Sequence, residues 1–369
     1  MQIKVTYILS NINKALAFEW IADYLDKNKF DLSFILLNPC ESALEKYLQN
    51  KKINVQRISY QGKKDLPNAI FTIYRILKKE KNQVVHCHLF DACIAGLTAA
   101  KLAGVKKRIY TRHHATFHQV YFPRAVWYDK IISSMATDVI AISDNVRQTL
   151  LGEGISPEKI HTIYHGFKLT DFQNIENIQI QTLRNKYNPS GNYPVIGVIS
   201  RYFELKGIQY TIPAFQKLLE SYPDALLLLA NTTGNYASQI KFLLQEVPQK
   251  NYIEVAFEPD IFAMYQLFDI FIHVPIDPSI EAFGQTYVEA LAAGVPSVFT
   301  LSGVAGEFIR DRQNALVVDF KDSDGIYRAM KEILSKINLR DTLTTQGRKD
   351  VCQMFTLEQM IHKLEHLYE

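Results

Sequence analysis

The chain has 369 residues, of which 47% are hydrophobic and 12% aromatic; this composition excludes a disordered protein and leaves room for two domains. It has no apolar run of the roughly 18–20 residues that span a membrane, no signal-peptide pattern, and four cysteines without framework spacing, so we expect a cytoplasmic protein. The net charge of +3 is uneven, because residues 1–168 hold 24 Lys and Arg against 14 Asp and Glu, whereas the rest hold 17 against 24.

The first half of the chain alternates short apolar runs with segments of helical periodicity. We expect strands at Ile3–Leu9, Leu32–Leu37, Val84–His88, Arg108–Thr111, Val139–Ser143 and His161–Tyr164. We expect helices between them at Ala17–Leu25, Pro67–Lys79, Ala92–Ala103 and Arg124–Ala136. This alternation predicts a doubly wound parallel sheet, which makes residues 1–170 the first α/β domain.

The polar stretch Asp171–Asn192 interrupts the alternation, and we predict that it is an interdomain linker. A second α/β domain is expected at residues 193–355. Its strands are predicted at Val195–Ser200, Ala225–Ala230, Ile253–Ala256, Ile270–His273, Ser297–Phe299 and Ala315–Val318. A last helix, Leu357–Tyr368, ends the chain.

The most informative stretch is Ser279–Val298, which places Glu281 and Glu289 eight residues apart. Between them, Phe283 and Gly284 are expected to open a helix, whose free N–H groups and positive dipole end form a site for an anion. A phosphate site flanked by two carboxylates suits a nucleotide-sugar, with phosphate at the helix end and hydroxyls on the acids. No G-x-G-x-x-G or P-loop motif is present, so dinucleotide-binding and P-loop functions lose their main support.

This stretch resembles the E-x7-E signature of the family 4 retaining glycosyltransferases, which have the GT-B fold of two facing Rossmann-like domains. The segment from Arg201 to Gly207 resembles the family's diphosphate clamp, G-R-x4-K-G, with Ser200 in place of the first glycine. The segments around His86 and Ile163 resemble two further landmarks in the first domain. In that family the last helix, here residues 356–369, packs back on the first domain.

The resemblance implies a role for each matching position. Arg201 and Lys206 would bind the diphosphate and stabilise its growing negative charge, in place of a metal ion. Glu289 would accept hydrogen bonds from both ribose hydroxyls, and Glu281 would contact the donor sugar. The resemblance therefore implies no metal and no cofactor besides the donor.

Further donor contacts are implied at the helix opening and in the first domain. The backbone N–H groups of Phe283, Gly284 and Gln285 would bind sugar hydroxyls or phosphate, and Thr286 adds a hydroxyl. His113 resembles the family histidine that reaches the donor sugar, and its neighbour His114 is the alternative.

Two other clusters have competing interpretations. A zinc site at His86, Cys87, His88 and Cys93 is rejected, because adjacent strand residues point to opposite faces and the spacing of zinc ligands is missing. The aromatic and basic segment 115–130 suits a membrane interface or a lipid-linked acceptor, although a helix start with ordinary core aromatics explains it equally well. The basic first half favours an anionic surface or lipid phosphate over nucleic acid, since no nucleic-acid module is recognisable.

The sequence thus predicts a retaining glycosyltransferase that moves a sugar from a nucleotide-sugar, with UDP favoured, to a glycan or lipid-linked acceptor in bacterial surface polysaccharide synthesis. Association with the inner face of the membrane would be peripheral. The family's Gly-Gly loop after the first strand is replaced here by Ser10–Lys14, and His165 replaces its usual asparagine. These departures keep two alternatives open: a nucleotide-sugar-binding subunit without activity, and a GT-B-like nucleotide-sugar epimerase.

Overall fold

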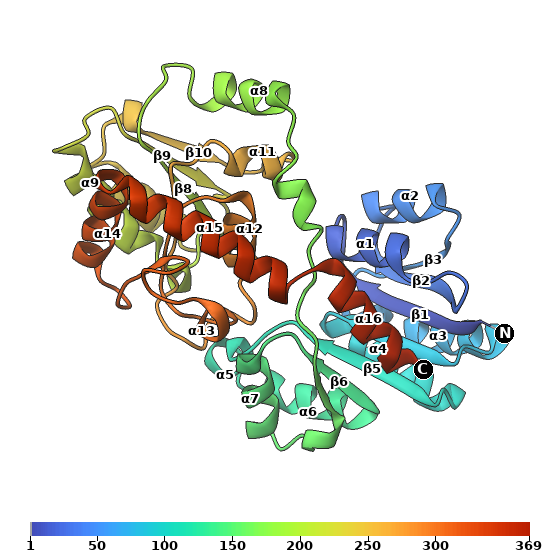
Figure 1. Cartoon of the computed structure of the whole chain (residues 1–369). Coiled ribbons are helices and arrows are strands. Elements are labelled where there is room, and N and C mark those ends of the chain that lie inside the picture. Colours follow the sequence, from blue (N-terminus) through green and yellow to red (C-terminus); the bar gives the residue numbers. More distant parts are fainter. Residues whose placement is uncertain (1) are drawn as a thin grey trace. The chain divides into compact units, whose positions relative to one another are not determined.

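The computed structural model describes residues 2–369, apart from the side chains of Phe117 and Val120. The chain forms two compact units, Met1–Phe167 with Leu357–Glu369 (unit 1) and Lys168–Thr356 (unit 2). Figure 1 shows the elements of both. Among the described residues, no helix has the length and apolar character that crossing a bilayer requires.

Unit 1 is built on a seven-stranded sheet with the order β3-β2-β1-β4-β5-β6-β7, in which every strand pair is parallel. The strands are β1 (Ile3–Ser10), β2 (Phe30–Asn38), β3 (Asn54–Ser59), β4 (Val84–His88), β5 (Lys107–Arg112), β6 (Asp138–Ala141) and β7 (Ile160–Thr162). The helices are α1 (Leu16–Tyr24), α2 (Ala43–Asn50), α3 (Leu66–Glu80), α4 (Phe90–Ala103), α5 (Phe117–Tyr121), α6 (Ala125–Met135), α7 (Asp144–Gly152) and α16 (Leu357–Tyr368).

The C-terminal helix α16 completes the core of unit 1. Its Leu357, Met360, Ile361, Leu364 and Tyr368 are buried in one hydrophobic cluster with residues of β1, β2 and α1. The Tyr368 hydroxyl contacts the Tyr7 hydroxyl and lies 2.7 Å from His86 Nδ1. The last helix therefore contributes both apolar and polar contacts to the first unit.

Unit 2 repeats the architecture with six parallel strands in the order β10-β9-β8-β11-β12-β13. The strands are β8 (Val195–Ile199), β9 (Leu226–Ala230), β10 (Tyr252–Val255), β11 (Ile270–His273), β12 (Ser297–Phe299) and β13 (Leu316–Val317). The helices are α8 (Asn177–Tyr187), α9 (Ile208–Leu219), α10 (Ala237–Leu244), α11 (Ile261–Tyr265), α12 (Gln285–Ala293), α13 (Ala305–Phe308), α14 (Ser323–Ser335) and α15 (Ile337–Met354).

Both sheets are doubly wound α/β sheets, as the alternation in the sequence predicts. All the expected strands are present, and the helix at Leu357–Tyr368 has the expected bounds. Other features differ. The sequence pattern does not predict the strand β3 or the helices α2, α5 and α7. The segment predicted as a linker, residues 171–192, contains α8 and belongs to unit 2. Leu183 and Tyr187 of α8 are buried, so this polar segment is packed rather than extended.

Candidate donor site

The carboxyl ends of β8 and β11, two neighbouring strands of unit 2, carry the candidate site. The chain order reverses between these strands, and doubly wound sheets bind their ligands at such a switch point. Lys206 lies in a 3-10 turn (Glu204–Lys206) after β8, and His273 is the last residue of β11. Glu281 lies in the loop between β11 and α12, so three polar side chains from different segments can converge here.

These three side chains form a largely buried polar cluster. Lys206 Nζ donates to Glu281 Oε1 at 2.5 Å, and His273 Nε2 lies 3.1 Å from the same oxygen. Burial alone would raise the pKa of the Glu281 carboxyl, but Lys206 and His273 outweigh it and hold that pKa well below its ordinary value. Burial lowers the pKa of His273, although Glu281 opposes the shift. Glu281 is therefore an ionised hydrogen-bond acceptor, not an acid with a proton to give.

A tight backbone approach brings Lys206 to Glu281. Gly207 follows Lys206 with φ +74°, and a Cβ at this position would lie 1.8 Å from the carbonyl oxygen of Val274. Only glycine fits, because any side chain would collide with the backbone that follows β11. The Glu281 loop is fixed from the other side, where its N–H donates to Ser302 Oγ at 3.1 Å.

The helix α12 opens as the sequence predicts. Gly284 precedes it with φ +86°, and the helix begins at Gln285. The backbone N–H groups of Gln285 and Thr286 have no acceptor inside the helix, since they belong to its first turn. Thr286 Oγ1 is buried and has no hydrogen-bond partner among the described residues. Phe283 is buried and packs edge-on against Phe355, and its carbonyl accepts from the N–H of Val304 at 3.0 Å, so its ring is closed to a ligand.

Glu289, one turn inside α12, has an unusual environment for a carboxylate. Its Oε2 accepts a hydrogen bond of 2.8 Å from the hydroxyl of Tyr265, the last residue of α11. Desolvation raises the pKa of Glu289 to about 7, and the Tyr265 bond offsets only part of that rise. A carboxylate kept poorly solvated gains from a ligand whose hydroxyls can donate to it.

Arg201 stands apart from the buried cluster. It lies two residues after the end of β8, and its side chain is exposed, with the guanidinium carbon 4.7 Å from the centre of the Phe203 ring. It makes no ion pair among the described residues, whereas Lys206 is already paired. The two predicted clamp residues therefore differ before any ligand binds: Arg201 has no ion-pair partner among the described residues, and Lys206 is paired with Glu281.

His113 belongs to unit 1, where it follows β5. Its Nε2 lies 3.0 Å from His88 Nδ1, and its ring stacks on His165 with centroids 5.7 Å apart. Burial lowers the pKa of His113 to about 3, so the imidazole is neutral at physiological pH. The alternative residue, His114, lies 3.2 Å from Asp129 Oδ2 and takes part in a different network.

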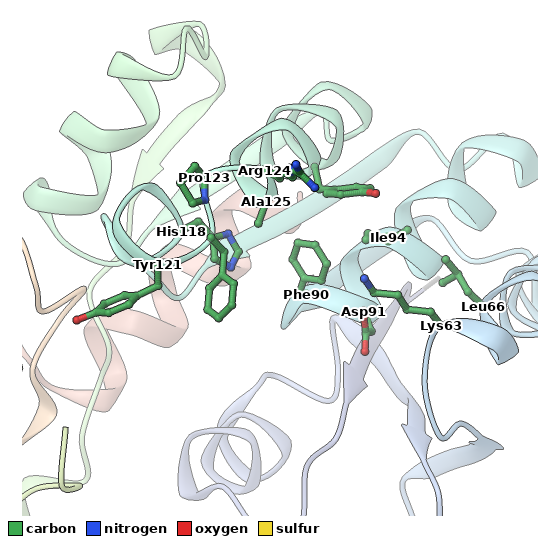
Figure 2. A pocket seen from close by; sticks show the side chains of 12 residues that line it. Lys63, Leu66, Phe90, Asp91, Ile94, His118, Tyr121, Pro123, Arg124 and Ala125 are labelled. Carbon is green, nitrogen blue, oxygen red and sulfur yellow. The ribbon is translucent and has the colours of Figure 1, made fainter. Parts of the chain in front are cut away.

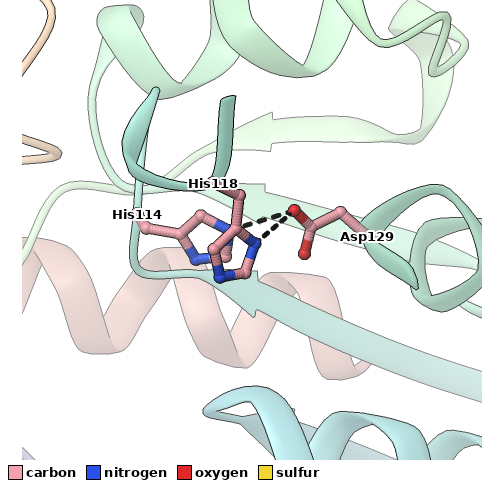
Figure 3. Close-up of side chains that lie close together, drawn as sticks. All are labelled: His114, His118 and Asp129. Carbon is pink, nitrogen blue, oxygen red and sulfur yellow. Dashed lines mark hydrogen bonds and ion pairs between the residues drawn. The ribbon is translucent and has the colours of Figure 1, made fainter. Parts of the chain in front are cut away.

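That network joins His114, His118 and Asp129 (Figure 3). His118 Nδ1 lies 2.6 Å from Asp129 Oδ2, and Arg112 contributes a buried guanidinium 3.2 Å from the same oxygen. Two histidines and a carboxylate could hold a metal ion. However, Arg112 already brings a positive charge to Asp129, so we interpret the group as an ion-pair network that holds the segment after β5.

The side chains of β4 lie on both faces of the strand. The rings of His86 and His88 share one face of β4, with centroids 4.1 Å apart. Cys87 lies on the other face, where its sulfur would be 2.6 Å from a Cβ added to Gly96 of α4. These side chains therefore do not surround a common point, as the alternation along a strand predicts.

Sequence reasoning misses two residues of the site, His273 and Tyr265. His273 has a signal, since it is a polar residue at the carboxyl end of an apolar strand. Tyr265 has none, because its partner Glu289 is 24 residues away and the contact depends on how α11 packs against α12.

Comparison with known protein families identifies the family of this chain. Residues 179–350 match the family Glycosyl transferases group 1, and residues 20–171 match Glycosyltransferase Family 4. The chain belongs to the family 4 glycosyltransferases. This family 4 glycosyltransferase has the GT-B fold and uses a nucleotide-sugar as its donor.

Relatives in sequence include the capsular polysaccharide biosynthesis glycosyltransferase CapM of Staphylococcus aureus, which is 26% identical over 81% of this chain and 80% of its own. The Escherichia coli UDP-Gal:alpha-D-GlcNAc-diphosphoundecaprenol alpha-1,3-galactosyltransferase is 22% identical over 83% and 79%.

Solved structures share the fold of this glycosyltransferase over nearly its whole length. A glycosyltransferase from Rickettsia africae has a TM-score of 0.83 and 22% identity, with 100% of this chain and 98% of the other covered. Anabaena Alr3699/HepE in complex with UDP-glucose has a TM-score of 0.84 and 18% identity, with 99% of each chain covered.

Proposed function

We propose that this glycosyltransferase transfers a sugar from a UDP-sugar, with retention of anomeric configuration, to a glycan or lipid-linked acceptor of a surface polysaccharide. The observation that carries the proposal is the Lys206–Glu281–His273 cluster near the opening of α12. Three similar proteins support the donor and the acceptor class: CapM of capsular polysaccharide biosynthesis, the galactosyltransferase with its UDP-Gal donor and diphosphoundecaprenol-linked acceptor, and HepE in complex with UDP-glucose.

The donor would bind by exchanging partners within this cluster. Its diphosphate would meet Arg201 and the first-turn N–H groups of α12, and draw Lys206 toward the phosphate oxygens. Glu281 would then accept from a sugar hydroxyl in place of part of its contact with Lys206. Glu289 would accept from the ribose hydroxyls, which would supply the solvation that its carboxylate lacks.

The state of Glu281 favours one route to retention. Its charge is shared with Lys206 and His273, which weakens it as a nucleophile, and its low pKa excludes it as a proton donor. Front-face displacement fits these properties. The bond from the anomeric carbon to the leaving phosphate oxygen breaks, the acceptor oxygen bonds to the same face, and the acceptor's proton passes to the leaving phosphate. Arg201 and Lys206 would stabilise that phosphate as its charge grows.

Two measurements test this proposal. UDP release should be seen with one member of a panel of UDP- and GDP-sugars together with a suitable acceptor, and NMR of the first-formed product should show the donor's anomeric configuration. An inverted product would refute the retaining mechanism, and no turnover with any donor would favour the non-catalytic alternative.

The proposal also holds that two cationic side chains replace a divalent metal. Turnover should therefore persist in excess EDTA at the rate seen without it. Loss of activity that Mg²⁺ or Mn²⁺ restores would show that Arg201 and Lys206 are not sufficient.

A further inference from the structure

Unit 1 contains a cavity of about 670 Å³ that the donor site does not use (Figure 2). Its volume is in the range of small-molecule sites. Most of its wall is apolar or aromatic, and the principal residues are Leu66, Phe90, Ile94, Tyr121, Phe122 and Tyr128.

The aromatic side chains of this cavity are packed on one side and remain open on the other. Phe90 meets the ring of Tyr128 edge-on at 6.1 Å and that of His118 at 5.6 Å. Tyr121, Phe122 and Tyr128 nevertheless remain 43%, 56% and 45% exposed. An apolar ligand would remove this surface from water, which is favourable for each ring that it covers.

Two cations line the same cavity. Lys63 and Arg124 are exposed, and neither makes an ion pair among the described residues. The one acidic lining residue, Asp91, lies in the first turn of α4, where the helix dipole stabilises its charge. His118 is held by Asp129. The cavity thus combines an apolar interior with two cations that no described acidic side chain pairs with.

The cavity lies at the ligand-binding edge of the sheet in unit 1. Phe90 begins α4 just after β4, and α5 follows β5, so both approach from the carboxyl ends of these strands. His113 also follows β5. A molecule in the cavity would therefore lie at the same edge as the histidine that the family resemblance assigns to the donor sugar.

We propose that this cavity binds the hydrocarbon chain of an amphiphilic acceptor, an isoprenoid or alkyl chain that ends in phosphate or diphosphate, and that Lys63 and Arg124 bind its anionic head. The inference rests on the proposed function and makes it more specific, since it selects a lipid-linked acceptor over a free glycan. Phe90 and the exposed rings supply the surface for the chain.

Calorimetric titration of the whole protein, without donor, with butyl, hexyl and octyl phosphate below their micellar concentrations tests the idea. Affinity should rise by about fourfold for each added methylene while the chain is still entering the cavity. Inorganic phosphate should not bind measurably, and octanol should bind more weakly than octyl phosphate.

Three variants separate the two halves of the site. Lys63→Gln with Arg124→Gln should lower the affinity for octyl phosphate by about tenfold and leave the affinity for octanol unchanged. The matched control, Lys78→Gln with Lys79→Gln, removes two exposed charges of α3 that do not line the cavity and should change neither. Ile94→Trp should fill the cavity and abolish the dependence on chain length, with circular dichroism confirming the fold.

The idea is overturned if chain length has no effect, or if both double variants weaken binding equally, since that result would show only a general attraction of the basic unit. UDP-sugar affinity should be normal in every variant, because the donor site lies in unit 2. If the unaltered protein binds no UDP-sugar, the proposed function is refuted, while the result with alkyl phosphates still stands.

Discussion

At the scale of single residues, the candidate donor site is organised by a partly buried cation that is already paired with a carboxylate. Lys206 is paired with Glu281, and His273 completes the arrangement. Removing one partner of such a pair leaves the other charged and poorly solvated, which costs more than the pair itself contributes. The cluster therefore prepares Lys206 for an anion while keeping Glu281 ionised.

Lys206→Ala should lower the rate of sugar transfer by about 10²–10³, because the leaving phosphate loses a preorganised charge. Donor affinity should change much less than the rate, since Arg201 and the α12 opening remain. Single-turnover kinetics and donor titration separate the two effects. Lys241→Ala, which removes an exposed lysine of α10, is the matched control and should change neither. An equal loss of transfer rate in Lys206→Ala and Lys241→Ala would show that the cluster has no special role.

Glu289→Gln should weaken binding of the intact nucleotide-sugar by about 1.5–3 kcal/mol, because an amide cannot accept from both ribose hydroxyls as a carboxylate does. The pH dependence provides a second signature. The carboxyl has a pKa of about 7, so its ionised fraction and the donor affinity should rise about tenfold from pH 6 to pH 8.

The Glu289→Gln variant should show no such rise in donor affinity. Stability should respond with the opposite sign, because the folded protein holds this proton more tightly than the unfolded chain between about pH 4.5 and 7. The contribution of Glu289 to stability therefore falls as pH rises through this window, and the Glu289→Gln variant should lack that component. A pH-independent donor affinity in the unaltered protein would contradict the ribose assignment.

At the scale of elements, positive-φ glycines set where the site's segments meet. Gly207→Ala should destabilise unit 2 by about 3 kcal/mol or more, since the left-handed backbone disfavours a side chain and the new Cβ would overlap the Val274 carbonyl. Gly306→Ala in α13 is the control, because nothing lies within 4 Å of its Cβ and its φ is not positive. Denaturant unfolding should show a large loss in the free energy of unfolding for Gly207→Ala, and little change or a small gain for Gly306→Ala.

The elements that the sequence predicts well are those whose pattern depends on burial on both faces. Every residue of β9 is buried, and its Leu-rich run indicates a strand directly. The edge strand β3 escapes prediction because Asn54, Gln56, Arg57 and Ser59 make it largely polar and only Ile58 is buried. The helix α8 has the composition of a linker for the same reason, since only Leu183 and Tyr187 anchor it.

The site is predictable to the extent that it follows local rules. The turn at Gly284 and the start of α12 follow from local backbone preferences, and the structure confirms both. The pairing of Lys206 with Glu281 joins residues 75 apart, and it exists because the parallel sheet places the ends of β8 and β11 side by side. Spacing along the chain carries no information about such a contact.

At the scale of the whole molecule, the charge asymmetry follows the two units. When α16 is counted with unit 1, that unit holds 24 Lys and Arg against 17 Asp and Glu, and unit 2 holds 17 against 21. Counting α16 in its proper unit thus reduces the contrast without removing it. Lys, Arg and exposed aromatics such as Trp127 together suit an anionic lipid surface.

We therefore predict that the protein binds vesicles containing phosphatidylglycerol and not vesicles of phosphatidylcholine alone. Each basic residue near an anionic bilayer contributes about 1 kcal/mol, so several acting together would hold the protein without a spanning helix. Flotation across a salt series measures this, and binding should fade as the screening length falls from about 10 Å at 0.1 M salt. If many cations share the attraction, both double variants should weaken vesicle binding to a similar degree. These variants are Lys63→Gln/Arg124→Gln and Lys78→Gln/Lys79→Gln. Their effects on octyl phosphate affinity, by contrast, should be unequal. A protein that stays with the soluble fraction at low salt, whatever the lipid, would show that the excess cations of unit 1 are only solvated. A lipid acceptor would then have to reach the cavity as a monomer.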